Sequence, residues 1–156
     1  MPNINPMLWF ENQAEDASKF YLSIFPNSKI TNTVYYDKAV AEAAGMPEGM
    51  VLIVDFELDG KQFTALNGGP QFKFSEAISF VIHVADQGEL DHYWNALTAD
   101  GGEESYCGWL KDKFGLSWQV VPSRLGELMA AGGGAASQAL MGMRKIVIAD
   151  LEAVAP

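Results

Sequence analysis

Cysteine and histidine are scarce in this chain, which holds one cysteine and two histidines among 156 residues. The single cysteine, Cys107, excludes an internal disulfide and any zinc site built on several thiolates. No run of 18 consecutive apolar residues occurs, so no membrane-spanning helix is expected. The opening residues MPNINPMLWFENQ lack the basic start and apolar core of a secretory signal. These absences predict a cytoplasmic protein.

Basic residues are also few, with 10 Lys and Arg against 20 Asp and Glu, which gives a formal net charge of −10. An acidic surface repels phosphate backbones, so nucleic acid is not expected as a partner. The sequence shows no phosphate-binding glycine loop, no Ser-His-Asp motif and no pair of metal ligands at helical spacing. Apolar residues make up 49% of the chain, which is enough for a folded core.

The apolar residues that are present repeat with a helical period in both halves of the chain. Each stripe follows the spacing i, i+3, i+4 and i+7, which is typical of one face of a helix. The stripes are offset by 90 − 17 = 73 positions and comprise Ala17, Phe20, Tyr21 and Ile24, then Leu90, Tyr93, Trp94 and Leu97. A capping signature precedes each helix, Asn12 with Glu15 and Asp86 with Glu89.

Short apolar runs rich in β-branched and aromatic residues predict strands around these two helices. They lie at 4–10, 30–36, 50–58 and 62–66, and again at 78–84, 104–109 and 116–121. Asp59 and Gly60 predict a two-residue hairpin, and 37–49 predicts a loop with one helical turn. The economical interpretation is an α+β fold made of two βαβββ modules. Module one covers about 1–70, module two covers about 75–125, and a C-terminal tail covers 126–156.

The tail is apolar and interrupted by glycine. We expect a flexible break at 132–134, a helix over 135–143, and an extended run or the start of a helical turn over 145–149. Such a tail needs a surface to bury against, either on its own domain or on a partner subunit.

Three phrases, FENQAEDASKFYLSIFP, FTALNGGPQFKFSEAIS and CGWLKDKFGLSWQVVP, resemble the PhnB-like proteins. That family is often labelled 3-demethylubiquinone-9 3-methyltransferase. It is part of the vicinal-oxygen-chelate superfamily, with glyoxalase I, extradiol dioxygenases and bleomycin-resistance proteins. The resemblance implies one domain over 1–156, in which the paired βαβββ modules form a curled mixed-sheet cup, and it implies a homodimer.

The methyltransferase label does not match the glycine pattern. A bound methyl donor normally lies at a glycine-rich turn between a buried parallel strand and a helix. Gly68 and Gly69 follow a strand edge, and Gly101 and Gly102 follow a helix end. We therefore do not expect methyl transfer.

The resemblance implies four metal-ligand positions, which fall near Asn5 or Pro6, near Ala65 or Asn67, and on Ser79 and Gln119. None of these residues carries a carboxylate or an imidazole, and neutral amides and hydroxyls do not hold a transition metal in water. We expect neither a resident metal nor another cofactor. Asp55 and Glu57 are predicted to be exposed, and the metal question would reopen if they faced the cup.

Strand alternation places His83 on one face with Ser79 and Val81, and Gln119 on one face with Ser117 and Val121. If these faces line the cup, Asn67, Ser79 and Gln119 give a ligand polar contacts, and Trp9 and Trp109 form apolar walls. The prediction is therefore a protein that binds a small organic molecule.

Two alternatives stay open. One is an enzyme of lyase, isomerase or dioxygenase type with His83 as a general base. The other is a dimer that sequesters an antibiotic or a metabolite, in which the net charge of −10 would steer a cationic ligand.

Overall fold

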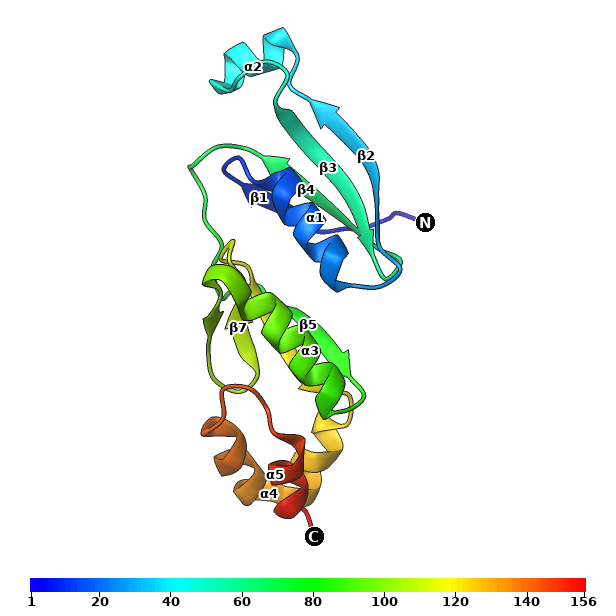
Figure 1. Ribbon diagram of the computed structural model, residues 1–156, viewed down its shortest axis with the longest axis vertical. Coiled ribbons are helices and arrows are strands. Elements are labelled where there is room, and N and C mark those ends of the chain that lie inside the picture. Colours follow the sequence, from blue (N-terminus) through cyan, green and yellow to red (C-terminus); the bar gives the residue numbers. More distant parts are fainter. The chain divides into compact units, whose positions relative to one another are not determined.

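The computed structural model describes residues 1–156, which form two compact units, Met1–Lys73 and Phe74–Pro156 (Figure 1). We call them the first unit and the second unit. Each contains one mixed four-stranded sheet with a helix across one face, so the predicted pair of βαβββ modules is confirmed. No helix is long and apolar enough to cross a membrane.

The first unit pairs its strands in the order β1-β4-β3-β2, with β1 parallel to β4 and the other neighbours antiparallel. Its elements are β1 (Met7–Phe10), α1 (Ala14–Ile24), β2 (Lys29–Tyr35), α2 (Lys38–Ala44), β3 (Val51–Leu58) and β4 (Lys61–Asn67). The hairpin between β3 and β4 turns at Asp59 and Gly60, whose φ angles are 50° and 78°. Positive φ at both central residues is the geometry expected of such a turn.

Helix α1 covers one face of this sheet and forms the core of the first unit (Figure 1). Along β3, Val54, Phe56 and Leu58 are buried on the helix side, and the Tyr21 ring stacks on Phe56 at 6.3 Å between centroids. Each such side chain contributes about 1.5–3 kcal/mol when it leaves water. The predicted apolar stripe of α1 is therefore the contact that fixes the helix on the sheet.

The start of α1 differs from the prediction. Asn12 does not cap the helix, because the helix begins one residue later and its N-cap residue, Gln13, makes no side-chain cap hydrogen bond. The amide oxygen of Asn67, at the end of β4, instead accepts from the backbone N–H of Ala14 at 2.8 Å. A side chain 53 residues away thus satisfies a backbone donor that helix ends leave unpaired.

The segment 37–49 holds more helix than the single turn expected. Asp37 caps α2 by accepting from the backbone N–H of Val40 at 2.9 Å, and Gly45, with φ of 69°, ends it in the left-handed region.

The second unit pairs its strands in the order β5-β8-β7-β6, with β5 parallel to β8. Its elements are β5 (Phe80–Val84), α3 (Gln87–Thr98), a short 3₁₀ turn (Ala99–Gly101), β6 (Glu103–Glu104), β7 (Trp109–Lys111), β8 (Ser117–Pro122), α4 (Leu125–Met141) and α5 (Ile148–Ala153). The expected cap of α3 is present, because the Asp86 carboxylate accepts from the backbone N–H of Glu89 at 2.9 Å.

The strand predicted over 104–109 is wrong, because the chain turns between β6 and β7. Cys107 and Gly108 there have positive φ angles of 59° and 84°. A Cβ on Gly108 would lie 2.8 Å from Ile146 Cδ1 and 2.9 Å from Val120 O, so only glycine fits. This close approach lets the tail pack directly on the second sheet.

The tail packs on the second unit, which is one of the two surfaces considered. Ile146 is fully buried, and the Gln87 amide both donates to Ile146 O at 3.0 Å and accepts from Ile148 N at 2.8 Å. The predicted glycine break at 132–134 is present as a kink in α4 at Gly133, whose φ of 55° and ψ of −133° are not helical. Of the run 145–149, Val147 is extended and α5 begins at Ile148.

Candidate functional site

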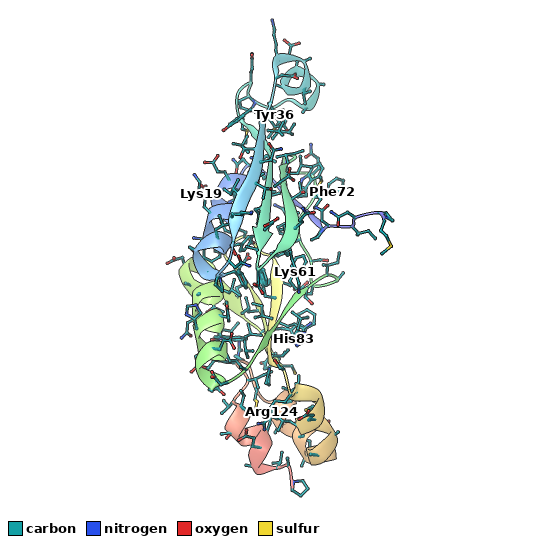
Figure 2. All side chains as sticks on the ribbon, turned by 90° about the vertical axis from the view of Figure 1, so that its right-hand side faces the viewer. Lys19, Tyr36, Lys61, Phe72, His83 and Arg124 are labelled. Atoms are coloured by element: carbon teal, nitrogen blue, oxygen red, sulfur yellow. The ribbon has the colours of Figure 1, made fainter.

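The face of the second sheet opposite α3 carries most of the predicted site residues. Register pairs Val81 with Gln119 and Trp109 with Gln119, so these three side chains share one face. His83 lies two positions beyond Val81 on β5 and projects away from α3 (Figure 2). We call this face, with Val81, His83, Trp109 and Gln119, the open face of the second sheet.

Gln119 finds its partner on the neighbouring segment. Its amide nitrogen donates to the hydroxyl oxygen of Ser79 at 3.0 Å, and its side chain is half-buried. Two residues that were predicted to contact a ligand are therefore in direct contact with each other. The amide oxygen of Gln119 remains as an acceptor next to Trp109.

A cavity of about 140 Å³ opens beside Trp109. Its walls include both hydroxyl and charged side chains, namely Ser105, Ser117, Lys111, Glu76, Glu103 and Glu104. Ser117 is only 1% exposed, and its hydroxyl has no hydrogen-bond partner. A buried polar group is normally paired, so this unpaired hydroxyl at a cavity wall is an unusual feature.

An ion pair lies at the wall of the same cavity. The Lys111 ammonium and the Glu76 carboxylate lie 2.5 Å apart. Their hydrogen bond raises the pKa of Lys111 and lowers the pKa of Glu76. Both groups are therefore charged near neutral pH and present a fixed dipole to the cavity.

Asn67, a predicted ligand contact, lies on the other side of its sheet. It is 2% exposed and faces α1. Besides accepting from Ala14, its amide donates to Val51 O at 2.9 Å, and its backbone oxygen accepts from the Tyr36 hydroxyl at 2.5 Å. These bonds hold the first unit together, so we leave Asn67 out of the candidate site.

Trp9 lies on the uncovered face of the first sheet, where it packs against the turn after β4. Its indole N–H donates to Gly69 O at 2.9 Å, and its ring meets Phe72 edge-on at 4.9 Å between centroids. A Cβ on Gly68 would lie 2.3 Å from the indole ring, so the ring can pack this closely only against glycine. The ALNGGP phrase therefore supplies the Asn67 cap of α1 and the glycines on which Trp9 packs.

The carboxylates of Asp55 and Glu57 also lie on the uncovered face. Both were predicted to be exposed. Both are half-buried on β3, and the Thr64 hydroxyl donates to Asp55 Oδ1 at 2.7 Å. Strand alternation indicates this face, because Val54, Phe56 and Leu58 are buried against α1 and the residues between them must point the other way. In neither unit do three or more His, Cys, Asp or Glu side chains lie close enough together to hold a metal ion.

The residues at the implied metal positions do not fit a divalent transition metal. Ser79 and Gln119 are hydrogen-bonded to each other, and the Asn5 amide donates to the Thr64 hydroxyl at 3.0 Å. Such neutral donors, already engaged with one another, lack the anionic or imidazole ligands that these metals prefer.

The sheet order, the parallel pairing of first and last strands and the covering helix recur in both units, and together they define a glyoxalase/bleomycin-resistance type of α+β fold. The family model described as 3-demethylubiquinone-9 3-methyltransferase matches residues 2–121, and the chain belongs to this family. No protein with a curated description matches the chain in sequence.

Solved structures agree with this assignment. The PhnB protein from Bacillus cereus is 29% identical, with a TM-score of 0.67 over 77% of this chain and 99% of that one. Protein PA1353 from Pseudomonas aeruginosa is 16% identical, with a TM-score of 0.61 over 78% of this chain and 98% of that one. The fosfomycin resistance protein FosX from Listeria monocytogenes is 16% identical, with a TM-score of 0.53 over 81% of this chain and 94% of that one. The last two likenesses concern the fold alone.

Proposed function

We propose that this PhnB-like protein binds a small organic molecule on the open face of the second sheet, without a resident metal. The observation that carries the proposal is the buried, unpaired hydroxyl of Ser117 at the wall of the cavity beside Trp109. Leaving such a group unpaired costs about 1–3 kcal/mol. A ligand that hydrogen-bonds to Ser117 recovers that energy.

The same surface defines the chemistry of the ligand. The indole of Trp109 offers an apolar wall, and the amide oxygen of Gln119 accepts one hydrogen bond. Ser117 both donates and accepts. A ligand with a flat apolar body and one or two hydrogen-bonding groups fits this set. A cavity of 140 Å³ is smaller than the usual range of about 300–1,000 Å³, so it would enclose only part of a larger molecule.

Ligand-induced stabilisation across a panel of aromatic metabolites and antibiotics tests the proposal. A ligand present at 100 times its Kd raises the free energy of unfolding by about 2.7 kcal/mol. At about 2–4 °C per kcal/mol, the expected rise in Tm is about 5–10 °C. Trp109→Ala and Gln119→Ala should abolish the rise, and Gln138→Ala, an exposed amide on α4, serves as the matched control.

Two results would overturn this function. One is a panel in which every stabilising compound acts equally on the wild-type protein and on Trp109→Ala. The other is elemental analysis that finds one Zn, Ni, Fe or Mn per chain. Methyl transfer is not part of the proposal, because no pair of glycines here opens a helix after a buried parallel strand.

His83 gives a second candidate, an enzyme, because the structure places its imidazole exposed on the same open face. A histidine side chain on that face can contact a bound molecule and serve as its general base. His83→Ala should then remove turnover of a bound compound while binding and Tm stay unchanged. His92→Ala, an exposed histidine on α3, is the control. Equal turnover in both variants would exclude this role.

We also expect the protein to form a homodimer and to be located in the cytoplasm. Light scattering on the purified protein checks the oligomeric state, and a mass of one 17.0 kDa chain would contradict the dimer.

A further inference from the structure

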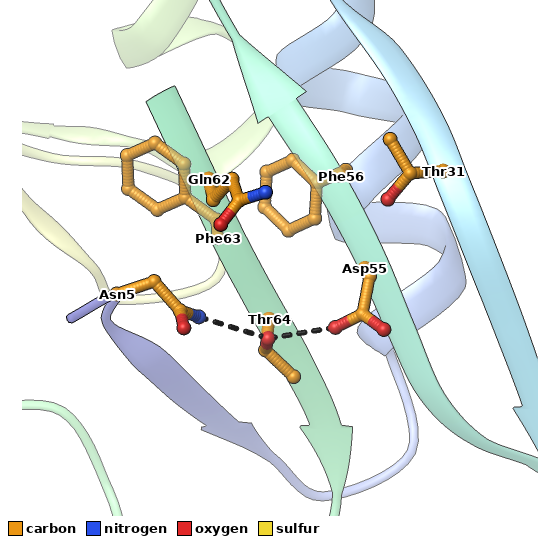
Figure 3. A pocket seen from close by; sticks show the side chains of 7 residues that line it. All are labelled: Asn5, Thr31, Asp55, Phe56, Gln62, Phe63 and Thr64. Carbon is orange, nitrogen blue, oxygen red and sulfur yellow. Dashed lines mark hydrogen bonds between the residues drawn. The ribbon is translucent and has the colours of Figure 1, made fainter. Parts of the chain in front are cut away.

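The first unit contains a cavity of its own, separate from the residues proposed to bind a ligand in the second unit. It measures about 250 Å³ and lies on the face of the first sheet that α1 does not cover (Figure 3). Polar side chains from three strands and the N-terminal segment line it, namely Asn5, Thr31, Asp55, Gln62 and Thr64. Phe56 and Phe63 also border it, although their stacked rings lie on the α1 side of the sheet.

A directed chain of hydrogen bonds runs along this wall and ends on a carboxylate. The Asn5 amide donates to Thr64 Oγ1 at 3.0 Å, and the Thr64 hydroxyl donates to Asp55 Oδ1 at 2.7 Å (Figure 3). Thr64 is 8% exposed and has one proton, which goes to Asp55 because its oxygen already accepts from Asn5. The chain therefore holds the Asp55 carboxylate in one orientation toward the cavity.

Asp55 has no basic partner. Its other oxygen, Oδ2, accepts a long bond of 3.4 Å from the Asn32 amide, and the carboxylate forms no ion pair. Glu57, two residues along the same face, lies 3.8 Å from the Lys29 ammonium. A half-buried negative charge without a counter-ion favours occupation by a cation, since charges in such places are normally paired.

The remaining groups of the wall are acceptors that suit N–H donors. The amide oxygen of Asn5 accepts no hydrogen bond from the protein. Thr31 is the extra residue at a bulge in β2, where the register skips from Ile30 to Asn32, and bulges redirect side chains in this way. A carboxylate, an amide oxygen and a hydroxyl together match the three donors of a primary ammonium.

We infer that this cavity is a binding site for the ammonium group of a small organic amine, with Asp55 as its counter-ion and the Asn5 amide oxygen and Thr31 hydroxyl as further acceptors. A metal ion is a poorer occupant, because Asp55 is the one carboxylate of the wall and the unit has no cluster of anionic ligands. The inference rests on the first unit alone and goes beyond the proposed function of the second.

The test titrates benzylamine and, separately, benzyl alcohol into the isotopically labelled full chain and follows backbone amide signals by NMR. Benzyl alcohol has nearly the same shape but no charge. Salt at 0.15 M limits non-specific attraction to the acidic surface, because the screening length is then about 8 Å. We expect benzylamine to shift the signals of β3 and β4 saturably, and benzyl alcohol to bind at least about tenfold more weakly.

Matched variants separate this site from general electrostatics. Asp55→Asn should weaken benzylamine binding at least about tenfold, as expected for loss of a hydrogen bond to a charged group. Glu57→Gln removes the same charge from the same strand face outside the cavity and should leave affinity nearly unchanged. Asn5→Ala, in an exposed segment, shortens the hydrogen-bond chain and should weaken binding if Asp55→Asn fails to fold.

Three outcomes would overturn the inference: no saturable shift with benzylamine, equal binding of benzyl alcohol, or equal weakening by Glu57→Gln and Asp55→Asn. Shifts confined to the second unit would also count against it. Such shifts would leave the proposed function standing, since that function concerns β5, β7 and β8.

Discussion

Replacing Ser117 by alanine should stabilise the protein, although most substitutions of buried residues do the opposite. Ser117 is 1% exposed and its hydroxyl is unpaired. Burial without a partner costs about 1–3 kcal/mol, which the Ser117→Ala variant no longer incurs. Against this gain stands the small void left by the oxygen. At about 24 cal/mol per Å³ and a volume of about 12 Å³, the void costs about 0.3 kcal/mol.

The expected net effect is a gain of about 1 kcal/mol in the free energy of unfolding, or a rise of about 2–4 °C in Tm. Urea denaturation of wild type and variant measures it directly. Thr64→Val is the matched control, because Thr64 is also a buried strand hydroxyl but donates to Asp55 at 2.7 Å. That variant should lose about 1–2 kcal/mol, since a hydrogen bond to a charged group is removed while water reaches the half-buried carboxylate.

The two variants therefore have opposite expected signs. A loss of 1 kcal/mol or more in Ser117→Ala would refute the reasoning, because it would mean that the hydroxyl is already satisfied. Under the proposed function, the same variant should bind ligand more weakly than wild type while it unfolds at higher denaturant. Stronger binding, or an unchanged Kd, would remove Ser117 from the site.

Three further predictions concern groups that hold the fold. Asn67→Ala should lower the free energy of unfolding by about 2–4 kcal/mol, because it leaves the Ala14 N–H and the Val51 carbonyl unpaired; a loss below 1 kcal/mol in urea would contradict this role. Asp112→Ala should cost about 3 kcal/mol or more, since this 2% exposed carboxylate accepts from two backbone N–H groups and the Trp118 indole; near-wild-type stability would disprove it. Hydrogen bonds from the Gln87 amide and then from Lys145 lower the pKa of Asp91 below its usual value of 3.8. The ionised carboxylate therefore stabilises the folded state above pH 3.8, and this stabilisation is lost as the pH falls further. An NMR titration midpoint at or above 3.8 would contradict this prediction.

Local periodicity was enough to predict most of the helices and strands. The stripes of α1 and α3, the alternation along β3 and β5, and the turn at Asp59 and Gly60 each depend on a few consecutive residues. Alternation also grouped Ser79 with His83 and, separately, Gln119 with Ser117, because the side-chain period of a strand is fixed at two. Register then placed Val81, Trp109 and Gln119 on one face, which only the pairing of the strands could decide.

Contacts between segments far apart in the sequence could not be predicted from the local residue pattern. Asn12 looked like the cap of α1, yet Asn67 fills that role from the end of β4. The strand predicted over 104–109 breaks at Cys107 and Gly108, because the tail passes there and only glycine fits against Ile146. In both places a partner far along the chain outcompeted the local signal.

The sequence by itself determined the family, the two βαβββ units and the face on which Gln119 lies, since motif and strand period are local properties. Only the tertiary structure decided which polar groups are paired. Gln119 donates to Ser79, whereas Ser117 on the same strand is buried without a partner. It also decided that Asp55 faces a cavity without a counter-ion. Pairing and enclosure depend on register and on atoms brought together across the sheet, and no run of neighbouring residues specifies them.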